Sequence, residues 1–248
     1  MKAGLSLISL IMGWIVLSPA QGSIPTWFEK LPKAPPGVRL AVGCSGKFIN
    51  EKRAKAAAIE SAQKNMAKQI SIRLIFDLEE LADGRLRLLN PSFKQYYEET
   101  DLRTVKNNYS VVDSLITVEG YYVLLAYPKS DNLRLDPTRE NDWGPRPDWI
   151  NNLPTERGYV YGVGMAAKYS NWLRAWYDAD EFARFDVGKN IQISTESIHT
   201  SKRDNRTTVE SVILKQSYDL TLKGATIVAR WFDAQAGAYY SLCRAPRQ

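Results

Sequence analysis

The sequence has very few of the residues that most often carry out chemistry. Its 248 residues include one histidine and two cysteines. A Ser–His–Asp triad would have to use the single imidazole of His199, and no nucleophile-elbow motif accompanies it. Histidine and cysteine also do not recur at the spacing of a zinc site. We therefore predict no catalytic residue, no metal ligand and a protein that is not an enzyme.

Other side chains could bind or cleave a sugar, but each has a simpler interpretation. The acidic pairs Glu79-Glu80 and Glu98-Glu99 could serve glycoside hydrolysis, although isolated acidic pairs usually lie on solvated faces. The aromatic residues Tyr96-Tyr97, Trp172 and Trp176 could stack on sugars. We expect them instead to cover half-buried surface.

The sequence also lacks a block of basic residues. Lysine and arginine total 33 against 27 acidic residues, a net charge of +6, but the two signs are interleaved along the chain. Nucleic-acid-binding domains usually concentrate positive charge on one segment or face. We therefore expect no nucleic-acid partner, and only weak attraction to anionic partners such as cell-wall polymer.

Outside the N-terminus the chain has no long hydrophobic run. At the N-terminus, Lys2 precedes an uncharged apolar run from Ala3 to Leu17, and Ser18-Pro19-Ala20 follows. This order is typical of a secretory signal peptide. We predict that residues 1–20 are a signal peptide cleaved after Ala20, with an uncleaved anchor as the alternative. The mature chain is then expected in the periplasm or at the cell surface, without a transmembrane span.

The two cysteines are predicted to be buried without a lipid anchor. Neither follows the signal sequence at the spacing of a lipidated cysteine. An exported protein can form a disulfide, but the repeat described below aligns Cys44 with Met165 and Cys243 with Leu125. Because both counterparts are apolar, we expect each cysteine to act as a small core residue; an intramolecular bridge is the alternative.

What the sequence does contain is one stretch that occurs twice. The run from Arg53 to Ile72 recurs from Arg174 to Ile193 at a constant offset of 121 residues (179 − 58 = 121 for the pair Ala58 and Ala179). Apolar or small residues fall at every fourth position, which is the spacing of one helical face. These positions are Ala54, Ala58, Ala62, Met66 and Ile70, then Ala175, Ala179, Ala183, Val187 and Ile191. Asn50 and Asn171 are the expected N-caps.

Strand patterns surround each predicted helix. Residues 38–43 and 159–164 predict a first strand, and residues 70–78 and 191–198 a second. Residues 91–106 and 207–220 could each hold a further helix. Both copies close on a predicted hairpin, with Glu119-Gly120 as the first turn.

The sequence thus predicts an α+β protein of two tandem homologous domains. Each reads β-α-β-(α)-β-β, with an alanine-faced helix packed on a mainly antiparallel sheet. The domains are residues 25–128 and 147–246. The intervening residues 129–146, rich in Pro, Asp, Asn and Arg, are predicted to form a linker. From this linker we expect separate hydrophobic cores.

A glycine motif in the second copy raises the possibility of a nucleotide site. Gly162-x-Gly164-x-x-Ala167 follows a strand and precedes a helix, as in dinucleotide-binding proteins. The helical pattern, however, resumes only near Asn171, too far away for the helix N-terminus to meet a pyrophosphate at the glycines. We predict instead that these glycines allow the strand to approach the alanine face closely, and we predict no cofactor.

The combined pattern resembles the twenty-kilodalton LPP lipoprotein family of bacterial envelope proteins, which is related to flagellar accessory proteins. The resemblance is carried by a Pro-x-Trp opening, a strand ending in Gly-x-Gly, the alanine-rich helix and a Trp-Phe-Asp…Gly-x-Tyr-Tyr hairpin. The second copy matches more fully, at Pro147, Trp149, Tyr161, Gly162, Gly164, Ala175, Ala179, Ala183, Ile191, Ile193, Trp231, Asp233, Gly237, Tyr239 and Tyr240. The chain departs from the family's lipoproteins in having no lipidation cysteine.

The resemblance implies a function without catalytic residues. We expect an exported envelope protein that acts by protein–protein contact, including self-association, as a structural or assembly factor, with flagellar assembly as one setting. The alternative is a regulatory module of the periplasm that binds peptidoglycan or another polysaccharide.

Overall fold

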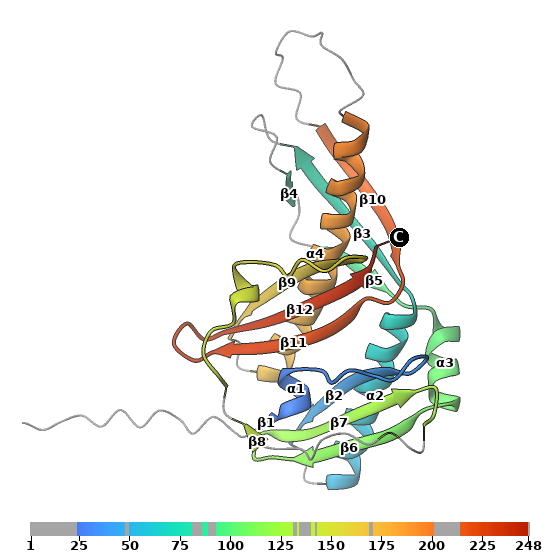
Figure 1. Ribbon diagram of the computed structural model, residues 1–248. Helices are drawn as coiled ribbons and strands as arrows, with labels where there is room; N and C mark the ends of the chain where they lie inside the picture. The colour runs from blue at the N-terminus through green and yellow to red at the C-terminus, as the bar shows by residue number, and fades with distance from the viewer. Residues whose placement is uncertain are drawn as a thin grey trace, which may run out of the picture.

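The protein has an α+β fold, as the sequence predicts. The computed structural model describes residues 24–47, 50–80, 86–88, 93–130, 133, 140–141, 143–168, 171–200 and 214–247. Two long helices lie against sheets, and every strand pairing is antiparallel (Figure 1). Within these ranges, no helix combines the length and the apolar character needed to cross a membrane.

The first half of the chain forms a three-stranded sheet covered by one helix. Strand β2 (Arg39–Gly46) pairs with β7 (Gly120–Tyr127), which pairs in turn with β6 (Ser110–Ile116). Helix α2 (Glu51–Ile70) packs on β2 and β7. The backbone amide of Thr117 donates to the Gly120 carbonyl, which confirms the predicted hairpin. The turn itself is Val118-Glu119, one residue earlier than the predicted Glu119-Gly120, because Gly120 already belongs to β7.

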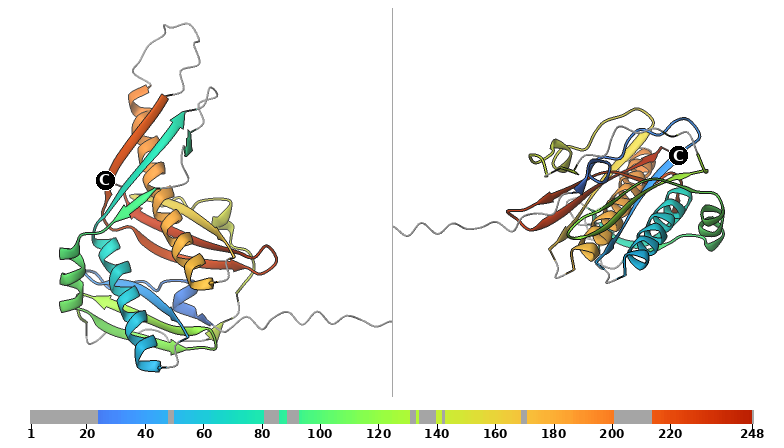
Figure 2. Two further views of the ribbon diagram at one scale, coloured as in Figure 1. Left: turned by 180° about the vertical axis from the view of Figure 1, so that it is seen from behind. Right: turned by 90° about the horizontal axis from the view of Figure 1, so that it is seen from below.

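The second half repeats this arrangement. Strand β9 (Tyr159–Ala167) pairs with β12 (Ala238–Pro246), which pairs with β11 (Thr226–Asp233). Helix α4 (Trp172–Thr200) packs on β9 and β12. Seen from below, α2 and α4 lie side by side on the same side of the molecule (Figure 2).

A third sheet joins the two halves. Strand β3 (Ile72–Glu80) from the first half pairs along its whole length with β10 (Leu214–Leu222) from the second. Two short strands, β4 (Leu86–Leu88) and β5 (Lys94–Tyr96), also pair with β3. This ribbon and the C-terminal part of α4 extend together beyond the other two sheets (Figures 1 and 2).

Short elements complete the fold. Helix α3 lies against α2, and the very short α1 lies against β11. Strands β1 and β8 form a small separate pair. The bounds of these elements are α1 Thr26–Glu29, α3 Glu99–Asn107, β1 Ile24–Pro25, β8 Glu140–Asn141 and the 3-10 helix η1 Asp148–Ile150.

Both repeated helices have the caps and the buried face that the sequence predicts. The side chain of Asn50 accepts hydrogen bonds from the first-turn amides of α2, and Asn171 does the same for α4. Ala58 and Ala179, the paired centres of the two stripes, are completely buried. The predicted helical phase is therefore confirmed in both copies.

Glycines on the sheets let the helix backbones come close. A side chain at Gly43 would overlap the Ala58 carbonyl oxygen and the Ala62 nitrogen of α2. A side chain at Gly164 would overlap the backbone of α4 at Ala179 and Ala183 in the same way. The contacts recur at the offset of 121 residues, because small residues on both partners are required wherever a helix axis lies this near a sheet.

The two halves share one core, so the prediction of separate cores is wrong. The largest buried cluster combines Phe28 and Tyr122 from the first half with Trp176, Phe232 and Tyr239 from the second. Strand β7 is buried on both faces, since its alternate residues face α2 on one side and this cluster on the other. Sequence periodicity identifies buried faces but not which half of the chain covers them.

Residues within the predicted linker take part in this core. Leu133 and Trp143 pack against the shared cluster, and the indole of Trp231 donates a 2.9 Å hydrogen bond to the Gly144 carbonyl. The described residues of 129–146 are therefore anchored to the body of the protein.

Two predicted elements of the second copy are wrong. Residues 191–198, predicted as a strand, lie inside α4, which continues to Thr200. Residues 214–220 of the predicted helix 207–220 belong to strand β10, and the rest of that range lies outside the described residues. The first copy is closer to expectation: β3 begins at Ile72, and the predicted helix 91–106 is divided between β5 and α3.

Both cysteines are buried and free, as expected for small core residues. Burial raises the pKa of each thiol to about 12, so both stay protonated at neutral pH. The predicted signal peptide, residues 1–20, lies outside the described residues.

Candidate functional site

The glycine motif that suggested a nucleotide site is occupied by protein. Side chains at Gly162 and Gly164 would both overlap the backbone of α4. The helix therefore covers the face of the sheet on which these glycines lie. The structure supports the prediction that the glycines serve close helix packing.

The other residues considered from the sequence do not converge on one place. Glu98 and Glu99 are exposed at the start of α3, and Trp176 is buried in the shared core. The ring of Trp172 stacks on Tyr122 with centroids 5.9 Å apart. The side chains of His199, Glu79 and Glu80 lie outside the described part of the structure.

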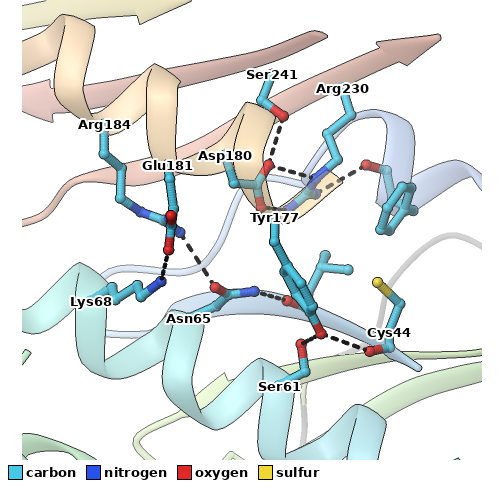
Figure 3. A network of polar contacts seen from close by, with 12 residues as sticks. Cys44, Ser61, Asn65, Lys68, Tyr177, Asp180, Glu181, Arg184, Arg230 and Ser241 are labelled. Carbon is cyan, nitrogen blue, oxygen red and sulfur yellow. Dashed lines mark hydrogen bonds and ion pairs between the residues drawn. The ribbon is translucent and has the colours of Figure 1, made fainter. Parts of the chain in front are cut away.

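A buried ionic network lies where α4 crosses the second sheet (Figure 3). Both carboxylate oxygens of Asp180 accept from the Arg230 guanidinium, at 3.1 and 2.8 Å. The Ser241 hydroxyl donates to Asp180 at 2.6 Å, and Arg230 also donates to the Phe28 carbonyl at 3.3 Å. The guanidinium carbon lies 4.6 Å from the centre of the Phe28 ring.

The protonation of Asp180 follows from these partners. Burial by itself would raise the pKa of this carboxyl group, but the nearby charge and hydrogen bonds of Arg230 outweigh burial and lower it. Asp180 is thus a carboxylate at neutral pH, and both of its oxygens are occupied. The network joins α1, α4, β11 and β12, and its geometry is that of a structural ion pair.

Polar side chains also close the outer edges of β2 and β9. The amide of Gln69 donates to the Leu40 carbonyl at 2.9 Å, and Asn190 donates to the Tyr161 carbonyl at the same distance. These two bonds are related by the repeat offset. On β2, the hydroxyl of Tyr177 reaches the Cys44 carbonyl at 3.2 Å. Edge strands need such cover because unpaired backbone groups invite further strand pairing.

One groove, of about 280 Å³, lies between α2 and α4. Its charged residues are already paired. Lys64 lies 2.7 Å from Glu60, and Lys68 lies 3.3 Å from Glu181. Since each cation has a carboxylate beside it, the groove presents little net charge to a ligand.

A second cleft, of about 480 Å³, differs in both charge and shape. We call it the basic cleft. It lies between the segment after α1, the start of β2 and the ends of β9, β11 and β12. Among the described residues that line it, four are basic and none is acidic; the basic residues are Lys30, Lys33, Arg39 and Arg244.

The structure holds the two arginines of the basic cleft in place. Arg39 donates a 3.0 Å hydrogen bond to the carbonyl of Gln69, near the end of α2. Arg244 stacks on the ring of Tyr159 and lies 3.3 Å from the carboxylate of Glu156. Glu156 also accepts from the Tyr161 hydroxyl, and this bond, with Arg244 and Lys33, lowers the pKa of its carboxyl group.

This arrangement is suited to binding. A cleft of this volume lies in the usual range for ligand sites, and positive charge on its walls favours an anionic ligand. The described residues of its lining include no acidic, histidine or cysteine side chain. The chemistry that these residues support is recognition of negative charge beside an apolar surface.

Sequence reasoning did not find the basic cleft. Lys30, Lys33 and Arg39 lie within ten residues of one another, whereas Arg244 is more than 200 residues later. The one available signal is the run from Leu31 to Gly37, in which three prolines keep the chain extended over the surface. The pairing of Leu31 with β11, through its amide and the Val228 carbonyl, helps to bring these residues together.

Comparisons of the chain with known proteins found no match. No protein-family model, no curated protein and no solved structure matches the chain.

Proposed function

We propose that this protein is a non-enzymatic component of the bacterial cell envelope. It is exported by its N-terminal signal peptide and acts through contact with another envelope protein, as a structural or assembly factor. The basic cleft supports this proposal best, because it offers an open surface whose lining charges all have one sign. The N-terminal sequence and the resemblance to envelope proteins support the compartment.

The rigidity of the body around the cleft also supports a binding role. Both halves contribute to one core, and the Asp180–Arg230 pair fixes α4 on the second sheet. A surface that is already held in its binding shape loses less conformational entropy when a partner binds.

Site-specific photo-crosslinking in living cells tests the proposal. A photoreactive residue replaces Lys33 or Pro154 in the cleft, or Lys52 on the exposed side of α2 as the control. We expect the two cleft positions to give the same crosslinked envelope protein and the control to give none. The intact mass of the recovered chain is measured in the same cells, where cleavage after Ala20 is expected.

Two outcomes would contradict the proposal. The first is a full-length chain in the cytoplasmic fraction with Met1 to Ala20 retained. The second is the absence of any envelope protein crosslinked from the cleft. Sedimentation with purified cell-wall sacculi, lost when cleft residues are changed, would favour the alternative of polysaccharide binding.

A further inference from the structure

The basic cleft combines exposed positive charge with a defined shape. Within the described residues, no hydrogen bond or ion pair uses the ammonium groups of Lys30 and Lys33, and both residues are exposed. The carboxylate of Glu156, which is held by Tyr161 and Arg244, lies outside the lining. The cleft therefore keeps positive charge available for a ligand.

The wall between these charges is aliphatic. Leu31, Val38 and Val228 contribute half-buried side chains to it, whereas Leu40 and Leu242, which also line the cleft, are only 2% and 4% exposed. Two aromatic residues also line the cleft: Tyr161 is only 8% exposed, and Trp149 is half-buried. Glycans bind best on open aromatic rings, whereas an aliphatic wall suits leucine-like or valine-like side chains.

The segments that form the cleft are fixed relative to one another. Leu31 donates its backbone amide to the Val228 carbonyl at 2.9 Å, which ties the N-terminal segment to β11. Arg39 bridges from β2 to the C-terminal end of α2. The charges are thus placed before any ligand arrives, and this lowers the entropic cost of binding.

We propose that the basic cleft binds an extended acidic segment of the partner protein, with its carboxylates beside the basic residues and its aliphatic side chains against the apolar wall. This inference rests on the proposed function, since it specifies what kind of partner the protein contacts. Charge complementarity determines the sign of the ligand, and the aliphatic wall favours a peptide over a glycan.

Fluorescence anisotropy with a defined probe tests this assignment on the mature chain. The probe is a dye-labelled, acetylated peptide of alternating glutamate and leucine. Peptides of the same length that alternate glutamine with leucine, or lysine with leucine, are the comparisons. We expect saturable binding of the acidic peptide alone, weakening as salt is raised because the contacts are electrostatic.

Two matched double variants localise the binding. Lys30→Gln with Lys33→Gln removes two exposed charges from the cleft, and Lys52→Gln with Lys55→Gln removes two from the exposed side of α2. The cleft variant should weaken binding about tenfold and the control less than about twofold, given typical energies of exposed charge pairs. Thermal unfolding of each variant verifies that both are folded.

Three outcomes would overturn the inference. The acidic peptide does not bind, or both double variants weaken it equally, or soluble polygalacturonate binds with the same dependence on Lys30 and Lys33 while the peptide does not. The last outcome would assign the cleft to an anionic glycan. If the peptide fails while cleft crosslinking in cells still captures an envelope protein, the inference falls and the proposed function stands.

Discussion

In both halves of the molecule a helix packs closely on a glycine of a sheet strand, but the residues beside this contact are apolar in one half and polar in the other. In the first half α2 lies on Gly43, and in the second α4 lies on Gly164, the residue 121 positions later. Gly43 pairs with Val123 of β7, whereas Gly164 pairs with Ser241 of β12. A branched apolar residue in one sheet thus corresponds to a buried hydroxyl in the other.

The helix residues that face these strand positions also differ, one being charged and the other apolar. Asp180 on α4 corresponds to Ile59 on α2, where a partly buried isoleucine packs against the cluster that contains Val123. In the second half, Asp180 binds Ser241 and Arg230 instead. The comparison shows that the glycine and alanine contact determines how near the helix lies. The residues beside it can be either apolar or ionic.

The halves also differ in the length of the helix. Helix α2 has 20 residues and α4 has 29. After the shared Ile-x-Ile, the first copy continues with alternating apolar residues at Ile72, Leu74 and Phe76, all buried in the sheet of β3. In the second copy the sequence after Ile193 is polar, and Val187, Ile191 and Ile198 have helical spacing. The alternating apolar residues favour a strand, so helix α2 ends before them. No such alternation follows Ile193, so helix α4 continues.

The largest loss of stability is expected when Asp180 of the second half is replaced by isoleucine, the residue at the corresponding position of the first half. Asp180→Ile leaves the Arg230 guanidinium buried without its carboxylate, and breaking such a pair costs about 3–5 kcal/mol. Urea denaturation of the full chain measures the loss. In the double variant Asp180→Ile with Arg230→Met, we expect more than half of the lost stability to return, because no buried charge remains. A double variant as unstable as the single one would show that the pair is not the cause.

The glycine contact should be nearly as sensitive in both halves. Gly43→Ala and Gly164→Ala each force a side chain against the helix backbone and should cost about 3 kcal/mol. Gly46→Ala is the control, because a side chain there meets open space. Since the core is shared, both variants should shift one common unfolding transition. Two transitions, each moved by only one variant, would contradict the shared core.

Enlarging the alanine face should have a moderate effect that is similar in the two halves. Ala58→Leu and Ala179→Leu should each overpack the helix–sheet contact and cost about 1–3 kcal/mol. Lys64→Leu, which gives up only the partly exposed pair with Glu60, should change stability by less than about 0.5 kcal/mol. Denaturant unfolding compares the three. If Lys64→Leu were the most damaging, the helical phase would be wrong.

The smallest effect is expected in a pH series that separates the two halves, because only part of the titration can be reached before acid unfolding. The pKa of Asp180 is lower in the folded chain than its ordinary value of 3.8. Its contribution to stability is therefore complete above about pH 3.8 and is lost as the pH falls below that value. Between pH 6 and pH 3.5 the wild-type chain should lose more stability than Asp180→Asn, which cannot titrate there. Equal losses would exclude this role for Asp180.

Part of this structure could be predicted residue by residue. The stripe of Ala54, Ala58 and Ala62 predicted a buried helix face, and Asn50 predicted the cap, because both depend on neighbours within a few turns. Residues 214–220 were wrongly predicted as part of a helix, although Tyr218, Leu220 and Leu222 alternate as in a strand. Val209, Val212 and Ile213 lie upstream at helical spacing, and this spacing favoured the helix prediction. The strand that stabilises β10 is β3, which lies far away in the chain.

The basic cleft could not be predicted at all. Lys33 and Arg244 look like ordinary surface charges in the sequence, and tertiary contacts such as the pairing of Leu31 with β11 bring their segments together. The buried pair of Asp180 and Arg230 was missed for the same reason: a charged residue 50 positions from its partner gives no periodic signal.

The sequence by itself determined the α+β class, the two alanine-faced helices with their caps, the hairpins and the burial of both cysteines. These features follow from local spacing and from the size of single side chains. The tertiary structure alone decided that the two halves share a core, that β3 and β10 join them, and that four basic residues line one cleft. Those features depend on contacts between residues far apart in the chain, for which local periodicity carries no information.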